Sequence, residues 1–255
     1  MARAAPAADR AEYAARGAAL AGYMRDAFWR EDRGLFTLDD TSPDMEVDFG
    51  HSAKALWFIA ISAAAAGDAE LEAWAKSKVR ALVDQALVEP QGAWASATDD
   101  PDHATWWVYA ELDQLVASMS LVDPELIAPL ERTGAWWLDN FVDETWGDTW
   151  SYVDIASGAP SGSGPKHWQW KSGFHAFEHA LVMYSVAAAQ EDGTAQLWFA
   201  RDPGEVGGLY LLDADLLSVE DFEVDGRALQ LASFGAVGFG DAAPVPAPAS
   251  ALLLA

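Results

Sequence analysis

The sequence predicts a mainly helical fold, built from helical hairpins and followed by a small β-rich appendage. Apolar residues recur at helical spacing through most of the chain up to about residue 192. A connection of one type recurs three times between these helices. From about residue 193, short apolar runs separated by glycines are typical of strands and turns. We therefore expect a helical domain (1–192), a β-rich appendage (193–240) and an Ala/Pro-rich tail (241–255).

Six segments carry the helical pattern, and local signals support their starts. Asp68 is expected to cap one helix, with Glu70 and Glu72 in its first turn, where the helix dipole favours negative charge. Asp123 followed by Pro124 predicts another start. The expected helices are 8–28, 49–66, 69–88, 102–120, 124–142 and 173–190.

The repeated connections are "EDRGLFTLDD", "EPQGAWASATDD" and "ETWGDTWSYVD". Each has a glycine, an aromatic residue soon after it, and short polar residues that end in Asp. The glycines are Gly34, Gly92 and Gly147, which lie 58 and 55 positions apart. This spacing predicts three units, each made of an outer helix, a tight turn or short β-hairpin, and an inner helix.

The second helix of each pair opens with an unusual mixture of polar and aromatic residues. These openings read "DFGHSAKALWF", "DHATWWVYAELDQ" and "KSGFHAFEHAL", whereas the first helices begin with ordinary residues. In a ring of helical hairpins the inner helices begin at the same mouth. We therefore expect the three openings to share one site.

Composition narrows the classes of partner. The net charge of −25 over 255 residues disfavours nucleic acid and anionic membrane surfaces, whereas neutral sugars fit. The chain has no cysteine, which excludes disulfides, zinc–thiolate sites and thiol nucleophiles. Thirteen tryptophans offer faces that can stack on sugars, although most single tryptophans belong to a core. We expect no signal peptide and no membrane-spanning segment.

Over about residues 25–190 the chain resembles the N-acylglucosamine 2-epimerase superfamily, which includes cellobiose 2-epimerases and mannose isomerases. The motifs are Gly50-His51 at a helix start, Trp106-Trp107 followed by Glu111, and Trp170-Lys171 followed by Phe174-His175. The resemblance implies an (α/α)6 toroid, the six-hairpin architecture that glycosidases also use. This chain would supply only the second half of that toroid.

The resemblance also implies a reaction. His51 and His175 match the catalytic pair, which moves a proton at C2 of a ring-opened aldose through an enediolate, without metal or cofactor. Proton return to the opposite face of C2 gives an epimer, and return to C1 gives a ketose. Trp107 and Glu111 match positions that stack on the sugar and bind its hydroxyls. Trp106 and Trp170 are expected to lie beside them.

Two departures from the family pattern bear on substrate and assembly. Family members often have Glu three residues after the first histidine and Arg three after the second, whereas this chain has Lys54 and Glu178. Enediolate stabilisation then falls to Lys54 or Lys171. Either the missing half of the ring comes from an N-terminal half or from a second copy in a homo-oligomer, or the fold is a short version of the toroid.

Other interpretations stay open at this point. "HAFEH" resembles a zinc motif through His175 and His179, but no third ligand follows on a later helix. Glycoside hydrolysis needs two carboxylates, for which Glu111, Glu178, Asp148 and Asp154 are candidates. A non-catalytic carbohydrate-binding or surface protein is the third alternative. The tail "PVPAPASALLLA" resembles the start of a PEP-CTERM sorting signal, which would imply export, or is an ordinary Ala/Pro-rich tail.

Overall fold

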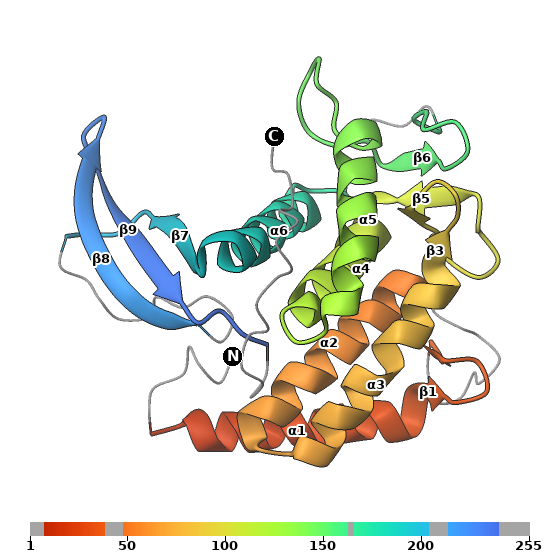
Figure 1. Ribbon diagram of the computed structural model, residues 1–255, viewed down its shortest axis with the longest axis horizontal. Coiled ribbons are helices and arrows are strands. Elements are labelled where there is room, and N and C mark those ends of the chain that lie inside the picture. Colours follow the sequence, from red (N-terminus) through yellow and green to blue (C-terminus); the bar gives the residue numbers. More distant parts are fainter. Residues whose placement is uncertain (1–7, 39–47, 163–165, 204–213, 240–255) are drawn as a thin grey trace.

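A computed structural model describes residues 8–38, 48–162, 166–203 and 214–239 (Figure 1). The tail that resembles a sorting signal lies outside these residues, so that interpretation stays a prediction. The helices are α1 (Arg10–Phe28), α2 (Phe49–Ala66), α3 (Ala69–Ala86), α4 (Trp106–Ser120), the 3-10 turn η2 (Pro124–Leu126), α5 (Ile127–Asn140) and α6 (Phe174–Asp192). The strands are β1 (Trp29–Arg30), β2 (Leu35–Phe36), β3 (Leu87–Val88), β4 (Ala93–Trp94), β5 (His103–Thr105), β6 (Tyr152–Asp154), β7 (Thr194–Phe199), β8 (Asp215–Val224) and β9 (Arg227–Gly235).

The predicted threefold repeat is confirmed in detail. In each unit the first helix runs into a tight turn that is closed by one antiparallel pair: Trp29 with Phe36, Leu87 with Trp94, and Val142 with Thr149. The glycines of the three turns, Gly34, Gly92 and Gly147, have φ angles of +70°, +67° and +72°, a region that glycine reaches without strain. Each glycine N–H donates to the carbonyl four residues earlier, at 2.8, 2.9 and 2.7 Å. The same turn therefore forms three times.

The second helices of the three units pack side by side in the order α2, α4, α6. Outside this row, α1 and α3 pack on α2, and α5 packs on α4. In Figure 1 the short hairpins gather at one end of the molecule, and the sheet of β7, β9 and β8 stands at the other. The result is an open row of helical hairpins, and a closed toroid stays a prediction.

The core is centred on α4, where every residue except Trp107 is buried. At its centre, Asp113 accepts hydrogen bonds from the Trp94 indole at 2.8 Å and the Thr133 hydroxyl at 2.7 Å. Since Asp113 also contacts His179, this carboxylate joins the second and third hairpin units. Buried residues of β7 and β9 belong to the same apolar cluster as the helices.

Two helix boundaries differ from the sequence prediction. Residues 103–105 form β5 and pair with β6, so α4 begins at Trp106 and not at residue 102. The competing bonds to β6 are long-range and leave no local signal. Asp123 caps the 3-10 turn at Pro124–Leu126, and the α-helix begins only at Ile127. The strands predicted after residue 193 are confirmed: β7, β9 and β8 form a three-stranded antiparallel sheet. The domain boundaries stay predictions.

None of the described helices has both the length and the apolar character that crossing a bilayer requires.

Candidate active site

The first turns of α2, α4 and α6 meet at one cavity of about 480 Å³. This convergence is the one predicted from the three unusual helix openings. The eight lining residues are His51, Lys54, Trp106, Trp107, Glu111, Trp170, Phe174 and His175. Seven of them belong to the set expected from sequence, and Phe174 is the addition.

Asp48 organises the start of α2. Its carboxylate caps the helix by accepting the His51 backbone N–H at 2.8 Å, and its other oxygen lies 2.8 Å from His51 Nδ1. This hydrogen bond raises the pKa of His51, with Glu111 adding to the effect. The helix dipole alone would favour a neutral imidazole, and the Asp48 carboxylate opposes this effect. Because a carboxylate accepts the Nδ1 proton, Nε2 is left to face a substrate.

Gly50 explains why α2 and α4 approach so closely at the cavity. A Cβ atom at this position would lie 2.8 Å from the Val108 Cα and 2.9 Å from Cζ3 of Trp107. Only glycine allows the two helix starts to meet without displacement.

Trp107 lies close to both histidines. Its ring centre is 4.7 Å from that of His51 and 6.0 Å from that of His175. A sugar ring or open chain stacked on this indole would therefore lie near both imidazoles.

A network of opposite charges lies deeper in the cavity. The Lys54 ammonium is 2.9 Å from Glu111 Oε2 and 3.3 Å from Glu178 Oε2. Glu178 also accepts a hydrogen bond from Gln114 at 3.2 Å. The exchanged charges at positions 54 and 178 thus form an ion pair between α2 and α6, although Glu178 itself does not line the cavity.

Three buried polar atoms of the cavity lack a hydrogen-bond partner among the described residues. They are Trp106 Nε1, Glu111 Oε2 and His175 Nδ1. Lys54 is close to Glu111 Oε2, and Glu111 Oε1 is 3.2 Å from His175 Nδ1, but neither contact has hydrogen-bond alignment. Because leaving such atoms unpaired is costly, this pattern indicates a polar ligand that supplies donors and acceptors.

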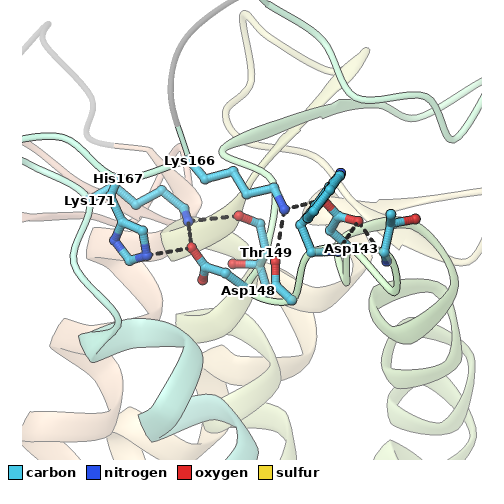
Figure 2. Close-up of polar contacts among 9 residues, drawn as sticks. Asp143, Asp148, Thr149, Lys166, His167 and Lys171 are labelled. Carbon is cyan, nitrogen blue, oxygen red and sulfur yellow. Dashed lines mark hydrogen bonds and ion pairs between the residues drawn. The ribbon is translucent and has the colours of Figure 1, made fainter.

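Lys171 is not brought to the cavity. It is about 1% exposed, its ammonium donates to the Thr149 carbonyl at 2.7 Å, and it contacts Asp148 at 3.4 Å (Figure 2). Burial lowers the pKa of Lys171, and Asp148 opposes this effect. Of the two lysines considered for enediolate stabilisation, only Lys54 therefore faces the cavity.

Glu111, His175 and Glu178 form the one group of potential metal ligands in the described residues, with ligand atoms within 4.8 Å of one another. The Lys54 ammonium contacts both carboxylates and already supplies the compensating cation. His179 turns away from the cavity to Asp113, at 2.7 Å, so His175 and His179 do not converge on one point. The side chains therefore fit an internal ion pair better than a metal ion.

The sequence analysis did not predict the contacts of two aspartates near the site. Asp48 has a local signal, because an Asp three residues before a helix-start histidine is placed to cap the helix and to reach the ring. Asp148 has no such signal, since its contacts to His167 at 2.8 Å and to Lys171 come from a segment about twenty residues further along the chain.

Comparisons with known proteins agree with this architecture at the level of fold. No family model and no curated protein matches the sequence. Among solved structures, a sugar epimerase from a ruminal bacterium is 19% identical, with a TM-score of 0.57 over 68% of this chain and 47% of that chain. Cellobiose 2-epimerase from Bacillus thermoamylovorans is 16% identical, with a TM-score of 0.56 over 66% and 46%.

A third structure, cellobiose 2-epimerase from Spirochaeta thermophila, is 20% identical, with a TM-score of 0.56 over 68% and 46%. The chain spans about half the length of these proteins. The resemblance first noted from three short motifs is thus found independently in the fold. Over two thirds of its length, this chain has the fold of the sugar 2-epimerases.

Proposed function

We propose that this chain acts on a sugar as an epimerase or isomerase, with proton transfer at C2 of a ring-opened aldose. The observation that carries the proposal is the placement of His51 and His175 beside the same indole, Trp107, in a cavity with unpaired buried polar atoms. The solved structures that share this fold are sugar epimerases by description, which supports the same class of substrate.

The reaction begins when one neutral imidazole removes the proton from C2 of the open-chain aldose. The C2–H electron pair moves into a C1–C2 double bond, and the carbonyl oxygen gains negative charge. An imidazolium then returns a proton. Delivery to the opposite face of C2 gives the epimer, whereas delivery to C1 with proton transfer between the oxygens gives the ketose. No redox partner is required, and histidine titrates in the right range for both directions.

Lys54 is proposed to stabilise the enediolate oxygen. Its side chain is partly exposed at the cavity, and the two carboxylates beside it hold the ammonium in place. A fixed cation at developing negative charge lowers the barrier more than a mobile one does, because it needs no reorganisation during the reaction. Glu111 is proposed to accept hydrogen bonds from sugar hydroxyls through its unpaired oxygen.

Glycoside hydrolysis is less well supported by the carboxylates. Glu111 and Glu178 contact the same Lys54 ammonium, and Glu178 does not line the cavity, so these two carboxylates do not flank a space for a scissile bond. Asp148 is paired with His167 and Lys171 outside the cavity. Asp154 accepts from the backbone N–H of Ser157 at 2.8 Å in a turn and does not line the cavity.

We also propose that further helices cover the free side of α6, from an N-terminal half or a second copy. Along α6, the exposed apolar side chains recur every three or four residues, which is the spacing of a helix-packing stripe. They are Phe174, Phe177, Leu181 and Tyr184. Light scattering after size-exclusion chromatography would test the second copy: a particle with the mass of one chain would exclude it.

The test of the catalytic proposal is deuterium exchange in D2O with mannose, glucose, cellobiose and N-acetylmannosamine, followed by NMR. We expect deuterium to enter at C2 for an epimerase, or at C1 and C2 for an isomerase. His51→Gln and His175→Gln should each abolish the exchange. His103→Gln is the matched control, because His103 pairs with Asp100 outside the cavity and its loss should leave exchange unchanged.

Two outcomes would contradict the proposal. Exchange that persists in the histidine variants would exclude the two-histidine mechanism. Sugar binding without any exchange by the native protein would favour the carbohydrate-binding alternative.

A further inference from the structure

The third hairpin unit differs from the other two in the path between its turn and its inner helix. In this unit a long segment follows β6 before α6 begins at Phe174. In its last part, residues 166–171, Lys166 and Lys171 reach the turn of the same unit (Figure 2). This part also carries Trp170, which lines the cavity. The position of one cavity wall therefore depends on how this segment is held.

Three basic side chains hold residues 166–171 on the turn. Lys166 pairs with Asp143 and donates to the Gly147 carbonyl at 2.8 Å. His167 contacts Asp148 at 2.8 Å, and Lys171 reaches both Asp148 and the Thr149 carbonyl. Among the three, Lys171 is the most deeply buried. An ammonium is costly to bury, so its placement requires these oxygen partners.

The two aspartates are a property of the third turn only. Alignment of the three turns on their glycines places Asp143 at the position of Arg30 and Val88. Asp148 takes the place of two buried apolar residues, Leu35 and Ala93. The turn itself therefore forms without these carboxylates, and their contacts with residues 166–171 distinguish this unit from the others.

Lys171 also fixes the small turn that presents Trp170. The backbone N–H of Lys171 donates to the Trp168 carbonyl at 3.0 Å, and the reverse bond is 3.3 Å. Trp170 lies within this turn with its side chain about 73% exposed. On the other side, the Lys171 ammonium lies 5.9 Å from the ring centre of Trp106, a cavity residue. Loss of the ammonium would remove the contacts with Thr149 and Asp148 that hold the turn of residues 168–171 in place.

We propose that Lys171, through Asp148 and Thr149, is a positioning residue that sets Trp170 and the first turn of α6 against a bound sugar. This inference rests on the proposed sugar-binding function of the cavity. It replaces the role in enediolate stabilisation that Lys171 was considered for from sequence. The lysine affects substrate binding through the wall it anchors and touches no reacting atom.

The test compares Lys171→Met with Lys78→Met, a control lysine that pairs with Glu31 on the surface of α3. Methionine keeps an apolar stem of similar length and removes the charge. We expect Lys171→Met to raise KM for the accepted sugar about tenfold with kcat changed less than about twofold, because a misplaced wall weakens binding more than chemistry. Asp148→Asn should raise KM in the same direction, since asparagine tolerates the positive φ of this position.

A second readout does not depend on turnover. The anisotropy of tryptophan fluorescence, with Trp170→Phe subtracted, reports how firmly Trp170 is held. It should fall in Lys171→Met and stay unchanged in the control. Unchanged anisotropy and unchanged KM in a folded Lys171→Met protein would overturn the inference. A lower anisotropy in a protein that turns over no sugar would support the anchoring and refute the proposed reaction separately.

Discussion

Gly50→Ala tests whether the contact between α2 and α4 determines the cavity. The added Cβ would lie 2.8 Å from the Val108 Cα, whereas ordinary contacts begin at 3.4 Å, so the helix starts must separate by about 0.6 Å. The obstacle is backbone and cannot rotate away. Overpacking of this kind costs about 1–3 kcal/mol. Alanine in a helix regains about 1 kcal/mol over glycine, so the net loss of stability is about 0–2 kcal/mol.

Gly22→Ala is the matched control, because a Cβ at this position in α1 meets nothing within 4 Å. It should gain about 0.5–1 kcal/mol from helix propensity alone. The difference between the two variants isolates the steric cost and predicts a Tm for Gly50→Ala about 2–12 °C below that of Gly22→Ala. Thermal unfolding by circular dichroism measures it. Equal stabilisation by both substitutions would refute the argument for close approach.

Three further predictions concern the charged groups. Asp48→Asn keeps the helix cap but weakens the bond that raises the pKa of His51. His51 then stays neutral to lower pH, so the acid limb of the exchange profile should move to lower pH; an unmoved limb would exclude His51 as its origin. Lys54→Met should reduce exchange at least about a hundredfold. It should also open the cluster of Glu111, His175 and Glu178 to Mn²⁺, which calorimetry would detect in the variant and not in the native protein. Asp113→Ala leaves three buried side chains without their hydrogen-bond partner and should lower the free energy of unfolding, measured in urea, by about 2–5 kcal/mol. A decrease below about 1 kcal/mol would show that these side chains find other partners.

The repeat was accessible to sequence analysis because its causes are local. Gly34, Gly92 and Gly147 each occupy a left-handed position in the same hydrogen-bonded turn, so their spacing alone predicts three units. Helix caps and periodicity are local in the same sense, which explains the accurate start of α2 and α3. The start of α4 was wrong by four residues because β5 pairs with β6, about fifty positions away.

The candidate site likewise has features with local causes, which the sequence predicts, and features that depend on the tertiary structure. The residue types at three helix starts predicted a shared cavity with two histidines, and seven of the nine expected residues line it. The sequence did not separate Lys54 from Lys171, since both stand near a helix start and a histidine. Only the tertiary structure placed one ammonium between two carboxylates in the cavity and buried the other beneath Trp106. Secondary structure and its repeats follow from local conformational preference, whereas the direction and charge environment of a side chain depend on residues that the fold brings from elsewhere in the chain.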